Sequence, residues 1–351
     1  MFEKIVALNK SGIKIHLHYF KYGERVNNDE LKKYCQSIDA YERKVGAKAL
    51  YPGLPYIVSS RTQQDLVVNL QKDDFPILVE GIHCTGILDS FQGNKRKIVV
   101  RLHNDESAYY KKLSESEKRI FHKIFFWKES NLLKKYQSHL PQNCHYACIS
   151  GTDIAIFRDQ YHLRNIDFLP AFVAWHEIKS LEGAGNFCLY HGNLSVAENE
   201  KAACWLLDKV FTKIKLPLVI AGKNPSKRLT KMAHLCQHTC LVANPSEKEM
   251  NDLVQKAHIN VLPSFNTTGV KLKLIHALFE GRHCIVNDAA VKGSELEPTC
   301  HISNSADNIA SIILQLYHQP FTEEEIHLRK RILYKTYNNA TNAEKIIAWL
   351  Y

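Results

Sequence analysis

The chain has 351 residues, of which 45% are hydrophobic and 23% are charged, so it is long enough for two domains that each bury a core. No apolar run approaches the roughly 20 residues that a membrane helix needs, and the N-terminal stretch 1–8 is too short and too charged for a secretory signal. The net charge of +10 suits an anionic partner, which leaves nucleic acid, an anionic membrane surface or a phosphorylated substrate.

The N-terminal half contains apolar segments typical of strands and two longer helical segments. We predict strands at 13–19, 56–59, 76–80, 97–102 and 145–149, and helices at 29–44 and 114–137. Residues 2–10 read as a helix, whereas a domain of this type normally opens with a buried strand and a glycine-rich turn. We therefore expect the first strand to be missing, either because the start codon is placed late or because the domain has lost that edge.

The C-terminal half alternates strands and helices more regularly. We predict strands at 186–191, 217–222, 239–243, 258–262 and 283–286, and helices at 198–211, after Pro225, after Ser246 and at 269–280. Glu249 follows Ser246 at the spacing of a capping box, which marks a helix N-terminus. Such alternation predicts a parallel, doubly wound sheet, whose ligands bind at the carboxyl ends of the strands.

We thus predict an α/β protein with two Rossmann-like, doubly wound domains. The first comprises residues 1–170 and the second residues 171–351, with the boundary near Leu169-Pro170-Ala171. The final helix, 342–351, is amphipathic and is a candidate to pack back on the N-terminal domain.

The ten cysteines are scattered singly along the chain. The closest pairs, Cys144 with Cys148 and Cys236 with Cys240, have no matching His or Cys pair nearby in the sequence. This pattern disfavours a zinc site and favours reduced, buried thiols in a cytoplasmic protein.

A loop that follows a predicted strand has the features of a phosphate site. The strand ends at Pro263-Ser264, and a polar loop and Gly269 lead into a helix with Lys271 and Lys273 near its start. A helix N-terminus presents free N–H groups and the positive end of its dipole, which favour an anion. If both lysines belong to the helix they lie about 200° apart, so only one faces the site, and we favour Lys273. The alternative is an ordinary strand–loop–helix unit with solvated lysines.

Several segments carry a family resemblance in matching order: 15–20 with Tyr22-Gly23, 78–83, 101–106 with Tyr109-Tyr110, 191–195, 220–223, and 263–266 through Gly281-Arg282. Together they resemble retaining bacterial glycosyltransferases of family four, whose two Rossmann-like domains face each other across a cleft (the GT-B fold). The resemblance implies a hexosyltransferase of polysaccharide biosynthesis. It would move a sugar from a nucleotide-diphosphate sugar, bound between the domains, to a saccharide or lipid-linked acceptor.

The resemblance also implies a cytoplasmic protein, peripheral at the inner membrane surface. No Asp-x-Asp triplet occurs in the chain, which fits a family that activates its leaving group without a metal. We therefore expect no metal and no cofactor beyond the nucleotide-sugar substrate.

Candidate site residues follow from the resemblance. His103 would lie over the donor sugar, where it can bond a hydroxyl or support an oxocarbenium-like transition state, and Glu80 and His83 would orient the acceptor hydroxyl. Negative charge on the departing diphosphate calls for fixed cations and N–H donors. The donor-binding candidates are Gly192, Asn193, Lys223, Thr268, Gly269, Lys271, Lys273 and His276. The alternatives are a structural histidine, loop-bonding side chains, ordinary turn glycines and surface lysines.

The sequence departs from the family pattern in the donor segment. Family members usually carry two glutamates eight positions apart, and Thr268 and His276 occupy those positions here. Asn193 replaces the usual Arg, and Glu198 replaces the usual Lys. The alternative function is therefore a non-catalytic protein of the same fold that holds a nucleotide sugar or a partner subunit.

Basic residues of the N-terminal half predict weak, reversible binding to anionic lipid. They are Lys95, Arg96, Lys97, Lys111, Lys112, Lys118, Arg119, Lys123, Lys134 and Lys135, with Phe121, Phe125, Phe126 and Trp127 interleaved on one predicted helix. The alternative is that these aromatic residues form the core face of that helix. Nucleic acid is disfavoured as a partner, because the chain has no zinc finger, RNP-type motif or basic tail.

Overall fold

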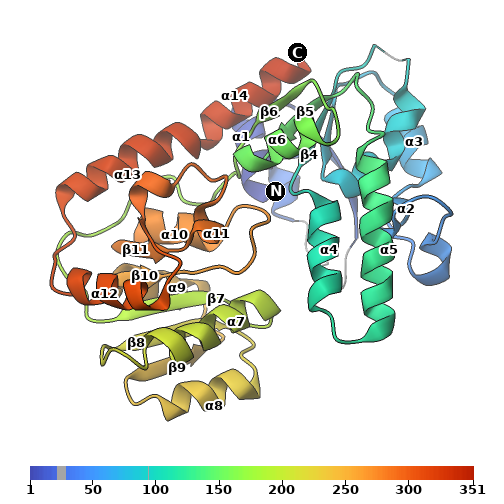
Figure 1. The fold of residues 1–351 in the computed structure, drawn as a ribbon. Coiled ribbons are helices and arrows are strands. Elements are labelled where there is room, and N and C mark those ends of the chain that lie inside the picture. Colours follow the sequence, from blue (N-terminus) through green and yellow to red (C-terminus); the bar gives the residue numbers. More distant parts are fainter. Residues whose placement is uncertain (22–28, 94) are drawn as a thin grey trace. The chain divides into compact units, whose positions relative to one another are not determined.

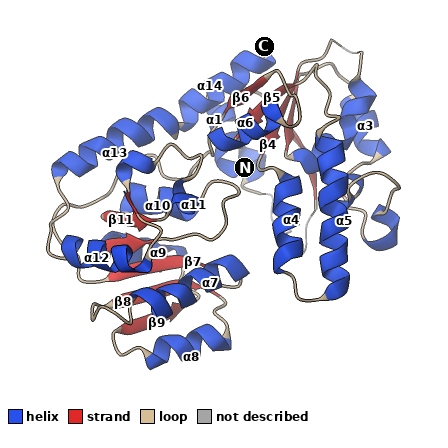
Figure 2. Ribbon diagram, viewed as in Figure 1, coloured by secondary structure: helices blue, strands red, loops and turns tan. Residues whose placement is uncertain are grey.

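The computed structural model describes residues 1–21, 29–93 and 95–351 (Figure 1). Its internal contacts divide the chain into two units, one formed by Met1–Phe172 with Asn338–Tyr351 and the other by Val173–Tyr337. Each unit is an α/β structure with parallel strands (Figure 2). None of the described helices combines the length and the apolar character that crossing a membrane requires.

The second unit is built on a six-stranded parallel sheet in the order β12-β11-β10-β7-β8-β9. Its strands are β7 (Cys188–Asn193), β8 (Leu218–Lys223), β9 (Thr239–Ala243), β10 (Ile259–Val261), β11 (His283–Val286) and β12 (His301–Ile302). The strand order reverses between β7 and β10, which pair in parallel through Ile259 and Cys188. In doubly wound sheets, ligands bind at the carboxyl ends of the strands beside such a reversal.

The helices that connect these strands begin after the carboxyl ends of the strands. They are α7 (Ala197–Trp205) with a π-helical turn (Leu206–Val210), α8 (Lys227–Leu235), α9 (Glu247–Lys256), α10 (Leu272–Glu280) and α11 (Asp288–Val291), and two further helices, α12 (Ala306–Leu316) and α13 (Glu323–Thr336), follow the last strand. The predicted capping box is present at α9, where Ser246 and Glu249 bond each other's backbone N–H groups. The predicted strands at 239–243 and 283–286 coincide with β9 and β11.

The first unit has four parallel strands in chain order and a separate parallel pair. The four are β3 (Ile77–Glu80), β4 (Ile98–Leu102), β5 (His145–Cys148) and β6 (Ile166–Phe168), and the pair is β1 (His16–Phe20) with β2 (Ser37–Tyr41). The helices are α1 (Phe2–Lys10), α2 (Tyr56–Ser59), α3 (Gln64–Leu70), α4 (Glu106–Ser116), α5 (Ile120–Gln137), α6 (Gly151–Asp159) and α14 (Asn339–Leu350). A long 3-10 helix, Ile82–Phe91, follows β3.

Two helices from opposite ends of the chain meet in the first unit. Leu8 of α1 and Ile346 of α14 belong to one buried cluster with Val99 of β4. His145 stacks on Trp349 with 4.3 Å between ring centroids, which ties the same helix to β5. The predicted helix 2–10 is confirmed as α1, which precedes β1.

Three predicted elements of the first unit are wrong in type or extent. The predicted helix 29–44 is a 3-10 turn, Leu31–Lys33, followed by β2, because parallel pairing with β1 overrides the local helical pattern. The predicted strand 56–59 is helix α2, whose first N–H groups, on Tyr56 and Ile57, are bonded 2.9 and 3.0 Å from the Glu129 carboxylate.

The predicted helix 114–137 is two helices, α4 and α5. Glu117 ends the first, and its carboxylate accepts hydrogen bonds from the N–H groups of Lys118 and Arg119, at 2.8 and 2.9 Å. These bonds satisfy groups that a continuous helix would have paired with its own carbonyls. Tyr22-Gly23, part of the family resemblance, lies outside the described residues.

Candidate functional site

The predicted phosphate loop lies after β10, beside the reversal in strand order. Asn287 holds its start, because the Ser264 N–H donates to the Asn287 side-chain oxygen and the Asn287 amide donates to the Ser264 carbonyl, both at 2.8 Å. Further on, the N–H and hydroxyl of Thr268 donate to the Asn266 side-chain oxygen at 2.9 and 2.8 Å. Gly269 has a φ of +66°, the left-handed region that glycine adopts without strain. Short polar side chains therefore fix the shape of this loop.

Lys271 braces the loop from within. Its ammonium donates to the backbone oxygens of Thr268 and Gly269, at 2.6 and 3.0 Å. The residue is the N-cap of α10, with a φ of −89° and a ψ of 93°, and the helix begins at Leu272. The predicted 200° separation assumed that both lysines lie within a helix from Gly269, so that argument does not hold.

Lys273 instead reaches across to β7 and α7. Its ammonium donates to the Tyr190 hydroxyl and to the Asn199 side-chain oxygen, both at 3.0 Å. It also lies 4.5 Å from the centroid of the Tyr190 ring, and the Tyr190 hydroxyl donates to the Asn199 backbone oxygen at 2.9 Å. Burial, with a smaller contribution from Lys271, lowers the pKa of Lys273 to about 7. These three side chains, called here the lysine junction, join the starts of two helices to the strand between them.

Gly192 and Asn193 end β7 next to the lysine junction. The Asn199 amide donates to the Asn193 backbone oxygen at 3.0 Å, and a Cβ on Gly192 would lie 3.4 Å from the Asn199 side chain. The Asn193 side-chain oxygen accepts bonds from the N–H and hydroxyl of Ser195, at 3.1 and 2.8 Å. Asn193 thus organises the turn into α7. Lys223, its register partner on β8, is exposed.

His276 lies one turn after Lys273 and is buried between two rings. It stacks on Trp175, with 4.5 Å between centroids and 11° between planes, and meets His191 edge-on at 5.7 Å. The Nε2 atoms of His276 and His191 are buried without a hydrogen-bond partner among the described residues. Burial lowers the pKa of His276 to about 4, so the ring is neutral near pH 7. Two neutral imidazoles therefore have unused hydrogen-bonding atoms near the start of α10.

The first unit brings the three predicted catalytic residues together where β3 and β4 end. Glu80 ends β3, and one of its carboxylate oxygens lies 3.0 Å from Nε2 of His103, while the other pairs with Lys4 of α1. Gly81 has a φ of +79° and turns the chain into the 3-10 helix that carries His83. The rings of His83 and His103 meet edge-on, with centroids 6.4 Å apart.

Burial and the neighbouring charges determine the protonation state of His103. Burial, with smaller contributions from Arg101 and Lys4, lowers its pKa to about 4, so the ring is neutral near pH 7. Because a carboxylate only accepts hydrogen bonds, the Glu80 contact places the ring proton on Nε2 and leaves Nδ1 as an acceptor. Burial, with smaller contributions from Arg61 and His103, also lowers the pKa of His83 to about 4.

Several residues of these clusters were not predicted as site residues. Tyr190 and His191 ended a predicted strand at the ligand-binding edge, which was a usable signal. No sequence signal pointed to Asn199, Trp175 and Lys4, because these residues reach the clusters from separate helices or loops. His276 contacts Trp175 and His191 and has no described bond to the residues of the lysine junction.

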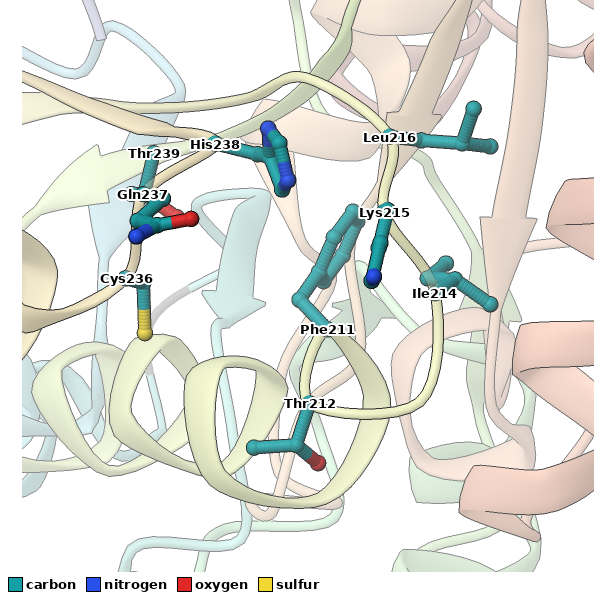
Figure 3. Close-up of a pocket in the computed structure, with 9 residues that line it drawn as sticks. All are labelled: Phe211, Thr212, Ile214, Lys215, Leu216, Cys236, Gln237, His238 and Thr239. Atoms are coloured by element: carbon teal, nitrogen blue, oxygen red, sulfur yellow. The ribbon is translucent and has the colours of Figure 1, made fainter.

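One hollow in the second unit lies away from these residues (Figure 3). It has a volume of about 230 Å³ and is lined by Phe211, Thr212, Ile214, Lys215, Leu216, Cys236, Gln237, His238 and Thr239. Thr239 is the first residue of β9, and Leu216 precedes β8, so the hollow lies at the amino-terminal edge of the sheet. The candidate site at the carboxyl edge is distinct from it.

Comparisons with known proteins bear on the second unit and on the fold. Residues 185–319 match the family model described as glycosyl transferases group 1. A Klebsiella pneumoniae protein, described as an uncharacterized 44.6 kDa protein in the cps region, is 26% identical over 276 residues, which are 73% of this chain and 69% of that protein.

Two solved structures show the same architecture. Anabaena Alr3699/HepE, in complex with UDP and glucose, is similar with a TM-score of 0.64 and 10% identity, over 99% of this chain and 94% of that chain. TarM is similar with a TM-score of 0.60 and 13% identity, over 81% of this chain but only 57% of TarM. The match to the group 1 model lies within the second unit, and the likeness to these structures shows that the chain has the GT-B fold of two Rossmann-like domains.

Proposed function

We propose that the protein is a glycosyltransferase that moves a hexose from a nucleotide-diphosphate sugar to a saccharide or lipid-linked acceptor. The observation that carries this proposal is the lysine junction at the reversal in strand order of a group 1 domain. The hydrogen bonds described for Lys273 go to a neutral hydroxyl and a neutral amide, so its positive charge has no carboxylate there to balance it. A diphosphate would supply that negative charge.

The lysine junction suits the chemistry of the leaving group. Negative charge grows on the diphosphate as the glycosidic bond breaks, and a preorganised cation stabilises that charge. A bound diphosphate raises the pKa of Lys273 above about 7, so the amine takes up a proton when the donor binds. The start of α10 adds backbone N–H groups that have no partner within the helix.

For the first unit we propose that His103 bonds a sugar hydroxyl or supports an oxocarbenium-like transition state. Its Nδ1 is an acceptor, because Glu80 holds the proton on Nε2. His83 would assist in orienting the acceptor hydroxyl. Retention of configuration and metal independence follow from the sequence resemblance and belong to the proposal. Lys273 and the N–H groups would stabilise the leaving group in place of a metal ion.

A non-catalytic protein that holds a nucleotide sugar or a partner subunit is the second candidate. It is favoured by Thr268 and His276, which stand where the family carries its paired glutamates. The N–H and hydroxyl of Thr268 donate to Asn266 and its carbonyl accepts from Lys271, whereas His276 is a buried, neutral ring. Neither supplies the charge that a carboxylate would.

Thermal unfolding with a panel of nucleotide-diphosphate sugars tests donor binding, because a ligand of the folded state raises the melting temperature. We expect a shift with at least one donor at millimolar concentration. No shift with any donor would contradict the transferase and the nucleotide-sugar-holding form of the second candidate. The effective donor is then tested for transfer and hydrolysis with His103→Ala. A transferase loses about a hundredfold or more in turnover, the scale of a positioned catalytic group, and much less in donor affinity. Donor binding without turnover in the wild type would establish the non-catalytic candidate.

We also propose that the acceptor side works at an anionic membrane surface, on the cytoplasmic side of the inner membrane, in polysaccharide biosynthesis. Phe121 and Trp127 of α5 are 87% and 62% exposed, whereas Phe125 and Phe126 pack on Tyr56 and Tyr110, so only part of the aromatic set lies on a packed face. The buried residues of α5 are Glu129, Ser130, Leu133 and Gln137. Exposed aromatic rings beside lysines suit a lipid interface. The relative in a cps region supports the link to polysaccharide.

A further inference from the structure

Three potential metal ligands meet in the second unit, at the edge of the sheet opposite the lysine junction. His283 is the first residue of β11, His301 is the first residue of β12, and Glu325 lies in the first turn of α13. One ligand atom from each lies within 4.8 Å of the other two. His283 is 3% exposed, whereas Glu325 is 33% exposed, so the cluster is reachable from solvent on one side.

The contacts of His283 leave an unbalanced pair of acceptors. Its Nε2 lies 3.1 Å from the Gln319 carbonyl oxygen, which only accepts, so Nε2 carries the ring proton. Its Nδ1 then presents a lone pair to a Glu325 carboxylate oxygen 3.1 Å away. Nδ1 has no hydrogen bond of acceptable geometry among the described residues. Two acceptors at this distance repel each other unless a positive species lies beside them.

The surrounding bonds resemble the support that metal-binding side chains receive. A ligating histidine almost always donates its other ring N–H to a carbonyl or carboxylate, as His283 does to Gln319. The second oxygen of Glu325 accepts the Thr322 N–H at 2.9 Å, within the capping box of α13, which fixes the direction of the carboxylate. His258 meets the His283 ring edge-on at 5.1 Å. Both of its ring nitrogens are already bonded, one to the Leu316 carbonyl and the other to the Gly185 N–H, so it is not a ligand.

The neighbouring groups define the kind of cation. Cys284 and Cys300 adjoin the cluster in sequence, but among the described residues the ligand atoms that lie within 4.8 Å of one another belong to His283, His301 and Glu325. The donors are therefore two imidazole nitrogens and one carboxylate oxygen, a set that Zn²⁺ accepts. Arg329 opposes a cation by its charge. One of its guanidinium nitrogens donates to the Gly281 and Leu278 carbonyls and the Ser180 hydroxyl, at 2.6, 3.2 and 3.0 Å, and the other donates to the Arg282 carbonyl and to the Cys284 sulfur.

We propose that His283, His301 and Glu325 bind one Zn²⁺ ion, with water completing its coordination. The ion would fasten the two-residue edge strand β12 and the start of α13 to β11. Its role is structural, because the amino-terminal edge of the sheet is away from the loops that follow β7 and β10. The cysteine pattern in the sequence disfavoured zinc, but this cluster needs no cysteine and draws its ligands from three separate elements.

The test uses the full chain, stripped with a chelator, desalted and titrated with Zn²⁺ against a competing indicator. We expect one tight equivalent and a higher melting temperature. Glu325→Gln and His301→Gln should each weaken binding by at least about tenfold, since losing a ligand costs no less than losing its supporting partner. Glutamine at position 325 still fits the capping box, so the fold of α13 is preserved.

The matched control is His327→Gln, which removes an exposed histidine 3.4 Å from Glu323 on the same helix. It should leave both the stoichiometry and the affinity unchanged. Replacing Zn²⁺ by Co²⁺ reports the ligand type, and we expect a spectrum without a thiolate charge-transfer band. A folded wild type that binds no Zn²⁺, Glu325→Gln and His301→Gln proteins that bind as the wild type does, or a thiolate band would each overturn the site. His283 and Glu325 would then be a structural pair without a metal ion. None of these outcomes depends on the proposed transfer reaction.

Discussion

A buried lysine has a carboxylate partner in the first unit and lacks one in the lysine junction of the second. Lys4 pairs with Glu80, which also bonds His103, so the polar cluster at the ends of β3 and β4 contains its own counterion. Lys273 bonds a phenol and an amide, both neutral. A buried charge is costly unless it is paired. Burial lowers the pKa of both lysines, but only Lys4 has a carboxylate in contact among the bonds described here, which is why we propose that Lys273 receives an anion from outside.

The largest expected effect tests whether the first cluster is complete. Glu80→Ala leaves Lys4 buried without its counterion, and breaking a buried pair in this way costs about 3–5 kcal/mol in the free energy of unfolding. Denaturant unfolding of the purified variant measures it. Combining Glu80→Ala with Lys4→Met removes both charges and should recover most of the loss. A change below about 1 kcal/mol in the single variant would show that Lys4 is held neutral by its burial and does not depend on Glu80 as a counterion.

The second prediction tests the open charge of the lysine junction. Lys273→Ala should weaken donor binding by about 1–3 kcal/mol, the scale of one charge-assisted hydrogen bond. Titration calorimetry with the donor identified by thermal shift measures it. Lys223→Ala, at an exposed strand end, is the control and should have a smaller effect. Equal losses in both variants would reduce Lys273 to one of several distant charges.

The third prediction concerns pH. The folded-state pKa of Lys273, about 7, lies below its ordinary value of 10.5, so between these values the unfolded chain binds more protons. The free energy of unfolding should therefore rise with pH over this window, and Lys273→Met should remove that slope. Donor binding should show the opposite trend, because the diphosphate requires the protonated amine.

Above pH 7 the donor affinity should fall by up to about tenfold per pH unit, with proton uptake on binding. Calorimetry in buffers of different ionisation enthalpy measures that uptake directly. A donor affinity that stays flat from pH 7 to 9 would show that Lys273 is already charged in the free protein.

The smallest expected effect concerns the exposed face of α5. Each basic residue near an anionic lipid surface contributes on the order of 1 kcal/mol, and the contribution falls off within the screening length. Co-sedimentation with anionic vesicles at low salt should decrease for Phe121→Ser and Trp127→Ser, while Leu50→Ser, at another exposed apolar residue of the same unit, should bind as the wild type does. Equal binding to neutral and anionic vesicles, or none at low salt, would rule out an electrostatic contact.

The local pattern of apolar and polar residues predicted most strands and helices of the second unit. Its strands β7 to β11 are short apolar runs bounded by turns and helix caps, and the capping box at Ser246 could be read from two residues. The pattern also placed Lys273 beside a strand end and a helix start, where a doubly wound sheet collects its ligand-binding groups. In the first unit the same reasoning found β3, β4 and β5, together with the alternation that puts Glu80 and His103 at neighbouring strand ends.

Tertiary structure decided what depends on partners distant in the chain. Ser37–Tyr41 is a strand because β1 is available to pair with it, and Tyr56–Ser59 is a helix that begins on the Glu129 carboxylate. The counterion of Glu80 comes from α1, the partners of Lys273 come from β7 and α7, and His283, His301 and Glu325 belong to three elements. The sequence by itself determined which segments form strands and which carry charge, because those properties are local. Only the folded structure determined which charges are balanced, because balance depends on contacts between residues that the sequence keeps apart.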